Sequence, residues 1–521
     1  MTQQKSDGRT VPEGRRKPVP THASAGGIAS TIDEHAWQLE LQLGTAEVSR
    51  GQNRGSQRSD GRSPTSIPER PVTPEPSLTN NRPTQATMED VVSQLNEAFC
   101  GVAKNKGAPG PDRQTIEVVG NHLPGVLSML TRTLLEESYR PGDIRRVWIP
   151  KSDGSQRGLG IPNVIDRIVQ EAVRRVLEPL YEPTFHASSH GFRPNRSCHT
   201  AIAMAKGYLE EGYEWVVDID LEKFFDRVHH QRLMARLALR VKDPRVLRLI
   251  GRMLKAKVVM PDGVQVSTEE GVPQGGPLSP LLSNIVLDEL DNELTRRGHR
   301  FVRYADDCNI YVRSQSAGTR VMASITDFIE RRMRLKVNTK KSAVARPKER
   351  HFLGFRLRRN TLDGSADVLL SKRSKDRIDQ TIRDRIPRGF GGSFEACIKQ
   401  LNTYLAGWIA FFGICTAAVE RTLKYLDAHI RRRLRALLVR QWKNRRTIVR
   451  KCIARGVPPR IAWRSIYGSR KGPWALSHCY ALDKALNIAF FAKAGLISLL
   501  KRWEEVQRAL AAPKQLTLPM V

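Results

Sequence analysis

The chain lacks paired cysteines, a long apolar run and a balancing number of acidic residues. Its seven cysteines are scattered without any Cys-x-x-Cys pair, which excludes a zinc ribbon and gives no support for a disulfide framework. The most apolar stretch, 485–500, is interrupted by Lys493, so no candidate membrane span of about 18 residues exists. The polar residues after Met1 do not form a signal peptide. We therefore expect a cytoplasmic protein without membrane association.

The shortage of acidic residues predicts a polyanionic partner. The sequence has 53 Asp and Glu against 86 Lys and Arg, a formal net charge of +33. A protein this basic most often binds nucleic acid. The alternative, a membrane surface, would require a basic amphipathic anchor or a lipidation motif, and we find neither. The length of 521 residues allows roughly two to four domains.

The first part of the chain predicts no stable fold. Residues 1–86 are rich in Gly, Ser, Thr, Pro, Gln and Arg, a composition that buries too little apolar surface to offset chain entropy. A short helix at 31–43 is the one exception that the pattern allows. Ordered structure is predicted to begin at Thr87, where Thr87-Met-Glu-Asp90 is typical of a helix start.

The most informative stretch is 301–313, where Asp306 and Asp307 stand between two apolar runs. The pattern predicts two strands joined by a tight turn with the acids at its tip. Adjacent carboxylates repel each other unless a cation neutralises them, and oxygen ligands suit Mg²⁺. For an isolated pair of acids, a solvated turn is the more common explanation, so the rest of the chain must decide.

A second group of acids follows an apolar run at 215–226. The pattern predicts a strand in which Asp218 and Asp220 share a face. A strand with one solvated face is an equally good explanation of these residues alone. Alternatively, one of the acids meets Asp306 across the sheet and forms a carboxylate site for two metals.

Two further segments carry groups suited to a nucleotide. Residues 145–162 predict a hairpin with Asp153-Gly154 in the turn, which places Lys151 and Arg157 where they could grip a triphosphate. Ordinary surface charge is the alternative. The loop 271–280 contains Gln274-Gly-Gly, and glycines allow a ligand close to the backbone; a plain loop before a helix is the alternative.

Residues 335–342 and 352–357 predict two further strands, and from about 371 the sequence is mainly helical. Residues 421–442 predict a helix with a leucine-rich stripe. Most of its remaining surface is basic, which favours contact with a nucleic-acid backbone over a merely solvated face; the candidate contacts are Arg431, Arg432, Arg433 and Arg435. Residues 456–500 place aromatic residues such as Trp463 and Tyr467 between cations, a pattern that suits either nucleic acid or a small helical core.

The ordered set of motifs resembles the bacterial group II intron-encoded reverse transcriptases, which are also maturases. The set contains His190-Gly-Phe-Arg, Asp220 to Asp226, Gly271 to Pro280, Tyr304-Ala-Asp-Asp307 and Phe352-Leu-Gly-Phe355. The resemblance implies an α+β right-hand polymerase fold. Fingers and palm would occupy 87–362, an α-helical thumb or maturase (X) domain 371–455, and a small helical nucleic-acid-binding segment 456–521, without an HNH nuclease.

The same resemblance implies roles for individual residues. Asp220 and Asp306 match the acids that bind two Mg²⁺ ions, with Asp307 as their neighbour and Asp218 outside the motif. Phe225 matches the residue that excludes a 2′-hydroxyl. The implied triphosphate contacts are Lys151 and Arg157, and Gln274 matches a position beside the incoming nucleotide. Residues 401–412 resemble the maturase motif, although Ala406 stands where the family more often has Arg.

The implied activity is RNA-directed DNA synthesis combined with binding of the intron RNA, which promotes splicing and retrohoming. The implied partners are group II intron RNA, an RNA template, a DNA primer or target DNA, and dNTPs. Two alternatives remain: a host-adopted or defence-associated reverse transcriptase without an intron, and an RNA-binding splicing cofactor without polymerase activity. The intact acids argue against the second.

Overall fold

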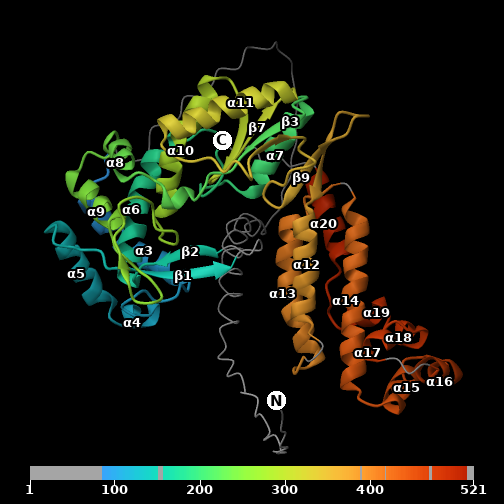
Figure 1. Ribbon diagram of the computed structural model, residues 1–521. Coiled ribbons are helices and arrows are strands. Elements are labelled where there is room, and N and C mark those ends of the chain that lie inside the picture. Colours follow the sequence, from blue (N-terminus) through green and yellow to red (C-terminus); the bar gives the residue numbers. More distant parts are fainter. Residues whose placement is uncertain (1–84, 151–155, 388–389, 417, 469–471, 513–521) are drawn as a thin grey trace, which may run out of the picture. The chain divides into compact units, whose positions relative to one another are not determined.

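The computed structural model describes residues 85–150, 156–387, 390–416, 418–468 and 472–512 (Figure 1). All of them belong to one compact unit. The predicted extension up to Thr84 and the helix predicted at 31–43 lie outside the described residues. In the described ranges, no helix combines the length and the apolar character needed to cross a membrane.

The first described helix begins where the sequence predicts it. The Thr87 side chain accepts from the backbone of Asp90, whose carboxylate accepts from the backbone of Thr87, and this capping box satisfies donors that a helix start leaves unpaired. The largely buried α6 (Val164–Tyr181) is packed by α2 (Met88–Ser93), α3 (Leu95–Lys104) and α4 (Ile116–Asn121), and α5 (Leu123–Leu135) packs on α2 and α4.

The first sheet contains the predicted hairpin. Strands β1 (Ile144–Pro150) and β2 (Gln156–Ile161) pair antiparallel, with Ile149 opposite Arg157. Two short strands complete the sheet in the order β2-β1-β4-β5; they are β4 (Val258–Val259) and β5 (Gln265–Val266). The hairpin prediction is therefore confirmed for both strands.

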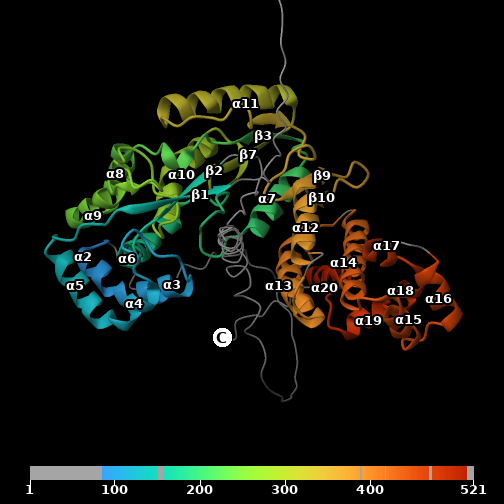
Figure 2. The ribbon, with the colours of Figure 1, turned by 60° about the horizontal axis from the view of Figure 1, so that its bottom comes forward.

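The second sheet joins the two acidic stretches. Its order is β6-β7-β3-β8, and all neighbours are antiparallel; the strands are β6 (Arg300–Tyr304), β7 (Asp307–Val312), β3 (Trp215–Ile219) and β8 (Ala343–Ala345). Helix α11 (Gln315–Asp327) covers one face, and α7 (Cys198–Glu210) lies on the other (Figure 2). Both faces are thus buried, which explains the near-continuous apolar runs in β3 and β7.

A strand predicted at 335–342 is not formed as such. Residues 338–342 form a turn instead, because the backbone N–H of Asn338 donates to the Asp220 carbonyl (2.8 Å) and Ser342 also bonds that residue. The strand follows this turn, as β8. The remaining elements of this region are η1 (Glu182–Thr184), η2 (Phe224–Asp226), α8 (His230–Ala238), α9 (Pro244–Leu254), α10 (Ser279–Arg296), η3 (Phe328–Arg332), β9 (Phe355–Arg359) and β10 (Ala366–Leu370).

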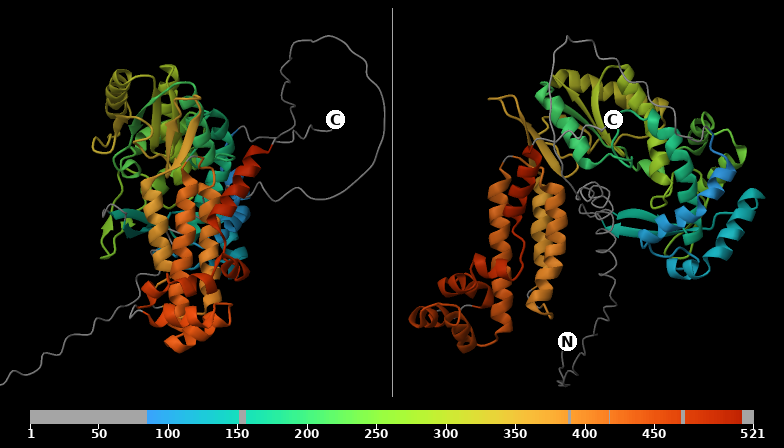
Figure 3. Two further views of the ribbon diagram at one scale, coloured as in Figure 1. Left: turned by 90° about the vertical axis from the view of Figure 1, so that its right-hand side faces the viewer. Right: turned by 180° about the vertical axis from the view of Figure 1, so that it is seen from behind.

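The part after β10 is helical, as predicted. Helices α12 (Lys372–Arg385), α13 (Phe394–Phe412) and α14 (Val419–Gln441) run alongside one another, and α20 (Leu499–Ala511) packs on α13 and α14 (Figure 3). Shorter helices follow α14; they are α15 (Arg445–Ile453), α16 (Pro459–Tyr467), α17 (Pro473–Leu476), α18 (Tyr480–Ala485) and α19 (Ile488–Lys493). The Phe352–Phe355 motif meets this part, since Phe355 stacks on Phe411 with ring centroids 5.4 Å apart.

Candidate active site and nucleic-acid surface

The turn between β6 and β7 carries the two adjacent acids, as predicted. Ala305 and Asp306 form the turn, and Asp307 is the first residue of β7, paired with Tyr304. Ala305 has φ 56°, in the left-handed region that tight hairpin turns require. The sequence pattern thus located both strands and the tip between them.

The register of β3 against β7 brings Asp220 to this turn. Ile219 pairs with Cys308, so the next residue on each strand places Asp220 opposite Asp307. The backbone N–H of Asp220 donates to the Ser342 hydroxyl at 3.0 Å, which fixes the point where the chain leaves β3. The two acidic stretches, far apart in sequence, therefore meet at one end of the sheet.

The acids at this end of the sheet influence one another electrostatically. The pKa of Asp307 is raised to about 7, first because surrounding protein displaces water and then because Asp306, Asp218 and Asp220 are negatively charged. Surrounding protein crowds the carboxylate, but Asp307 as a whole residue remains exposed to solvent. A cation bound among these carboxylates would relieve the repulsion.

The acids fit a divalent cation by their chemistry, with one exception. Asp218 is paired with Arg350, whose Nε donates to its carboxylate at 2.8 Å, so its charge is already neutralised within the protein. Across the described ranges, no group of three or more His, Cys, Asp or Glu side chains is arranged to hold a metal ion as it stands. The predicted trio is therefore adjacent but not preassembled as a metal centre.

Phe225 lies beside the glycine-rich loop. Its side chain is buried, and its carbonyl accepts from the backbone N–H of Val272 at 2.6 Å. Gly271 has φ +95°, and a Cβ there would lie 2.9 Å from the Phe225 carbonyl oxygen, so the close approach requires glycine. The loop 271–280 is thus docked against the end of the second acidic stretch.

The hairpin β1–β2 also contacts the loop 271–280. Arg157 donates through Nε to Gln274 Oε1 at 3.0 Å, and the backbone N–H of Gly160 donates to the Gln274 carbonyl at 2.6 Å. Gly275 has φ +121°, and a Cβ there would lie 2.5 Å from the Gly160 carbonyl oxygen. The structure therefore brings Arg157 and Gln274 together, whereas Lys151 lies outside the described residues.

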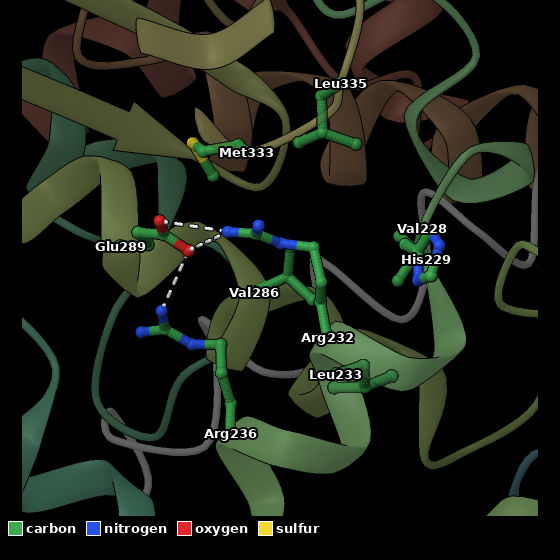
Figure 4. A pocket seen from close by; sticks show the side chains of 9 residues that line it. All are labelled: Val228, His229, Arg232, Leu233, Arg236, Val286, Glu289, Met333 and Leu335. Carbon is green, nitrogen blue, oxygen red and sulfur yellow. Dashed lines mark hydrogen bonds and ion pairs between the residues drawn. The ribbon is translucent and has the colours of Figure 1, made fainter. Parts of the chain in front are cut away.

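A small pocket between α8 and α10 is separate from these residues (Figure 4). Its volume is about 10 Å³, room for about one water molecule and too little for a nucleotide. Glu289 accepts from both Arg232 and Arg236, and Arg236 also pairs with Asp288, so the arginines that line the pocket are neutralised. We therefore do not place the reaction there.

The prediction for the basic helix is partly wrong. Arg435 in α14 is buried; it donates to the Leu486 carbonyl at 3.0 Å and is paired with Asp483. Arg433 donates to the Ile386 carbonyl at 2.6 Å, and Arg432 lies over the Trp474 ring at 4.3 Å. Helix α14 is covered by neighbours on more than its leucine side, so Arg435 cannot contact nucleic acid. Arg431, Arg432 and Arg433, which are partly exposed, remain predictions as nucleic-acid contacts.

An exposed basic and aromatic face occurs instead on α16. Trp463 and Tyr467 are 46% and 43% exposed, and their rings stack with centroids 5.0 Å apart. Arg460 and Arg464 are also exposed. These four residues follow an i, i+3, i+4, i+7 spacing and therefore share one side of the helix, while Ala462 and Ile466 are buried opposite them. We call this set the α16 face.

Sequence reasoning missed the charged groups behind the Asp306 turn. Arg303 is fully buried and pairs with Asp291 of α10, and it also contacts the loop of the His190-Gly-Phe-Arg motif through Ser189. One signal was available: an arginine in the middle of the apolar run Phe301 to Tyr304 must find a buried partner.

Two family models match the chain, one over most of the two sheets and the other over much of the helical part that follows. Residues 149–357 match the reverse transcriptase (RNA-dependent DNA polymerase) model. Residues 375–453 match the maturase-specific domain of group II introns. The first match contains the acids, Phe225, Arg157 and Gln274, and the second contains most of α12 to α15. Together they define a reverse transcriptase with a maturase domain.

Curated relatives agree with this class. Protein YkfC of Escherichia coli (strain K12) is 34% identical over 349 residues, which cover 59% of this chain and 89% of the relative. The group II intron-encoded protein LtrA of Lactococcus lactis subsp. cremoris is 30% identical over 339 residues, 50% of this chain and 56% of the relative. The chain belongs to the family of group II intron-encoded reverse transcriptases and maturases.

Other matches cover smaller shares of the matched protein. A putative COX1/OXI3 intron 2 protein of Saccharomyces cerevisiae is 29% identical, and the match covers 51% of this chain and 38% of the relative. The chain thus spans about half or less of LtrA and this yeast relative. A solved partial Cas6-RT-Cas1–Cas2 complex is 25% identical with a TM-score of 0.32, covering 47% of this chain and 43% of that one.

Family membership has direct consequences for this chain. It is an RNA-directed DNA polymerase, and a reverse transcriptase domain depends on a divalent metal ion. The maturase domain implies intron RNA as a partner, together with the nucleic acids that a reverse transcriptase copies.

Proposed function

We propose that this protein synthesises DNA on an RNA template at the end of the sheet where Asp220, Asp306 and Asp307 meet. The observation that carries the proposal is the pairing of β3 with β7, which puts acids from two distant motifs side by side. Asp220 and Asp306 would hold two Mg²⁺ ions, with Asp307 beside them. When bound, such ions neutralise charge on the attacking and leaving oxygens of phosphoryl transfer.

The surrounding residues select and orient the nucleotide. Arg157 and Lys151 would bind the triphosphate of a dNTP, and the Arg157–Gln274 hydrogen bond keeps the guanidinium beside the loop. The Phe225 ring would exclude a ribose 2′-hydroxyl, because the ring is buried and its backbone is held by the docked loop. The three acids would then act on the phosphate that reacts, while the cations of the β1–β2 hairpin hold the triphosphate.

The proposed division of the chain follows from these roles. Residues 87–362 would be the fingers and palm of a right-hand polymerase, with β1–β2 in the fingers and the β6-β7-β3-β8 sheet in the palm. Residues 371–455 would be the thumb or maturase domain, and 456–521 a further nucleic-acid-binding segment. The α16 face supports the last assignment, since exposed aromatics beside arginines stack on bases and contact phosphates.

We further propose that the protein binds its own group II intron RNA, promotes its splicing and carries it to a DNA target in retrohoming. The match of 375–453 to the maturase-specific domain supports this role over a reverse transcriptase without an intron. Because the substrates are nucleic acids, dNTPs and no membrane component, we place its action in the cytoplasm.

The decisive experiment replaces Asp306 by Ala. Primer extension on a primed RNA template with Mg²⁺ should be abolished, because the acid at the turn is lost. A matched control is Asp363→Asn, which changes an exposed-turn carboxylate between β9 and β10 and should leave extension unchanged. Full activity of Asp306→Ala would refute the metal assignment.

The same variant separates the two functions. Splicing of the intron RNA requires binding by the protein and not polymerase chemistry, so Asp306→Ala should still promote splicing. Loss of splicing in a folded variant, judged by an unchanged thermal melt, would show that the two functions share this site.

A further inference from the structure

The turn that carries Asp306 rests on a completely buried ion pair. The side chains of Arg303 and Asp291 both have 0% exposure. Arg303 Nε donates to Asp291 Oδ1 at 2.7 Å, and its Nη2 donates to the other carboxylate oxygen. The remaining N–H groups donate to Asn284 Oδ1 (3.0 Å), the Ala305 carbonyl (3.0 Å) and Ser189 Oγ (2.7 Å).

All five N–H donors of this guanidinium therefore have an acceptor, which is the full capacity of an arginine. The acceptors come from three parts of the chain: helix α10, the Ser189 loop and the hairpin turn itself. Removing a charge from water is costly, and an apolar pair of similar volume would often be at least as stable. Stability alone thus does not explain why a charged pair is buried here. The pair is explained if it holds these three elements in one arrangement.

The bond to Ala305 acts on the peptide next to Asp306. The Ala305 carbonyl belongs to the peptide that continues into Asp306, so holding this oxygen fixes the direction in which the turn proceeds. On the other side of the turn, a Cβ at Gly191 would lie only 2.3 Å from the Ala305 nitrogen. The Gly191 carbonyl in turn accepts from Asn284 Nδ2 at 2.9 Å. The turn is therefore enclosed between Arg303 and the Gly191 loop.

We propose that Arg303, paired with Asp291 and Asn284, is a positioning residue that holds the Ala305–Asp306 turn in its working orientation. Arg303 touches no reactant and acts only through the turn. This inference rests on the proposed function, because it takes Asp306 as the acid that binds the metal ion. It also gives the His190-Gly-Phe-Arg193 loop a role: the loop supplies the second wall of the turn.

The test compares a charged pair with an apolar one. The double variant Arg303→Met with Asp291→Leu removes both buried charges and roughly conserves volume, so it should fold. We expect kcat for primer extension to fall on the order of a hundredfold, the effect of a displacement of about 1 Å, while KM for dNTP changes less than about threefold. Mn²⁺ binding to the nucleotide-free protein, measured by electron paramagnetic resonance, should weaken about tenfold.

Two further variants keep the test decisive if the double variant does not fold. Asn284→Ala leaves the ion pair intact and removes one anchor of the turn, so kcat should fall while the thermal melt stays close to that of the wild type. Arg248→Met with Glu137→Leu removes an ion pair between α9 and the segment after α5, away from the turn, and should change neither kcat nor Mn²⁺ binding.

The outcomes separate this inference from the proposed function. A folded Arg303→Met/Asp291→Leu or Asn284→Ala variant with wild-type kcat and Mn²⁺ affinity would overturn the positioning role and leave Asp306 untouched. If Asp306→Ala itself retains extension and Mn²⁺ binding, the proposed function fails instead.

Discussion

Two buried arginines of this protein each pair with an aspartate, but in different settings. Arg303 and Asp291 are both fully enclosed beneath the sheet hairpin. Arg435 in α14 is 10% exposed, and its partner Asp483 in α18 is 37% exposed. The first pair joins a loop, a helix and a turn, whereas the second joins two helices and leaves its carboxylate open to water.

The difference shows that a fully buried ion pair can fix the positions of the elements it joins, whereas a partly exposed pair only connects two helices. Water can solvate Asp483 if Arg435 is removed, so that contact is replaceable. Water cannot reach Asp291, so the loss of Arg303 would leave an uncompensated charge. The enclosed pair thus tolerates little displacement of its partners, which suits it to hold the Asp306 turn.

The largest expected effect is the loss of folding stability when the arginine of either pair is replaced. Arg303→Met should lower the free energy of unfolding by about 3–5 kcal/mol because Asp291 stays buried and unpaired. Arg435→Met should cost on the order of 1 kcal/mol, because Asp483 is partly solvated. Urea unfolding of both variants measures this difference, and equal losses would remove the distinction.

The next effect concerns Gly191, whose loop lies against the Ala305–Asp306 turn. Gly191→Ala would force a Cβ to 2.3 Å from the Ala305 backbone nitrogen, so we expect primer extension to fall on the order of a hundredfold. Gly207→Ala in α7 is the matched control, because nothing lies within 4 Å of the added Cβ; it should stabilise the helix by about 0.5–1 kcal/mol. Extension assays and thermal melts of both variants test this. An active Gly191→Ala enzyme would contradict it.

A smaller effect should appear as a pH dependence of stability. Burial, together with the nearby Arg196, Arg193 and Arg303, lowers the pKa of His190 from 6.5 to about 4. The unfolded chain therefore takes up a proton below pH 6.5 that the folded protein refuses, so stability falls as the pH drops from 6.5 towards 4.

Replacing His190 by Gln should remove this contribution, so the melting temperature of the variant should fall less, relative to that of the wild type, between pH 6.5 and 4. His122→Gln alters an exposed histidine and should leave the curve unchanged. Equal slopes in the wild type and in His190→Gln would assign the effect to another group.

The smallest effect concerns how nucleic-acid binding depends on salt, and it distinguishes the arginines of α16 from Arg435 of α14. Arg460→Gln with Arg464→Gln on the α16 face should reduce the salt slope of single-stranded nucleic-acid binding by up to about 1 per lost phosphate contact. Arg435→Gln should lower stability and leave the slope unchanged, because its guanidinium is buried. Filter binding over a range of salt concentrations gives both slopes. A slope that changes only in Arg435→Gln would reverse the assignment.

Local patterns predicted the parts of the site that depend on neighbouring residues. The hairpins around Asp306 and between Arg146 and Gly160 follow from apolar runs and turn residues, and the structure forms both. The Thr87 cap is likewise local. What the pattern could not supply was the pairing of β3 with β7, because a register between distant strands depends on the packing of the whole sheet.

The errors have a common physical origin. Helix periodicity shows which side of α14 is apolar, but it does not show how many neighbours the helix has. Arg435 lies among α18 and α19 residues, and charged side chains can be buried wherever partners are available. The turn at 338–342 was also misjudged, since the acceptor of Asn338 is the distant Asp220 carbonyl.

The link between the hairpin β1–β2 and the glycine-rich loop has a practical consequence for redesigning substrate choice. At Gln274 the main chain holds the hairpin through Gly160, while the side chain separately contacts Arg157. A substitution at 274 can therefore change what the side chain offers a nucleotide and leave the anchoring bond in place. Gly275, pressed against the Gly160 carbonyl, offers no such freedom, so a library aimed at nucleotide analogues should vary 274 and keep 275 constant.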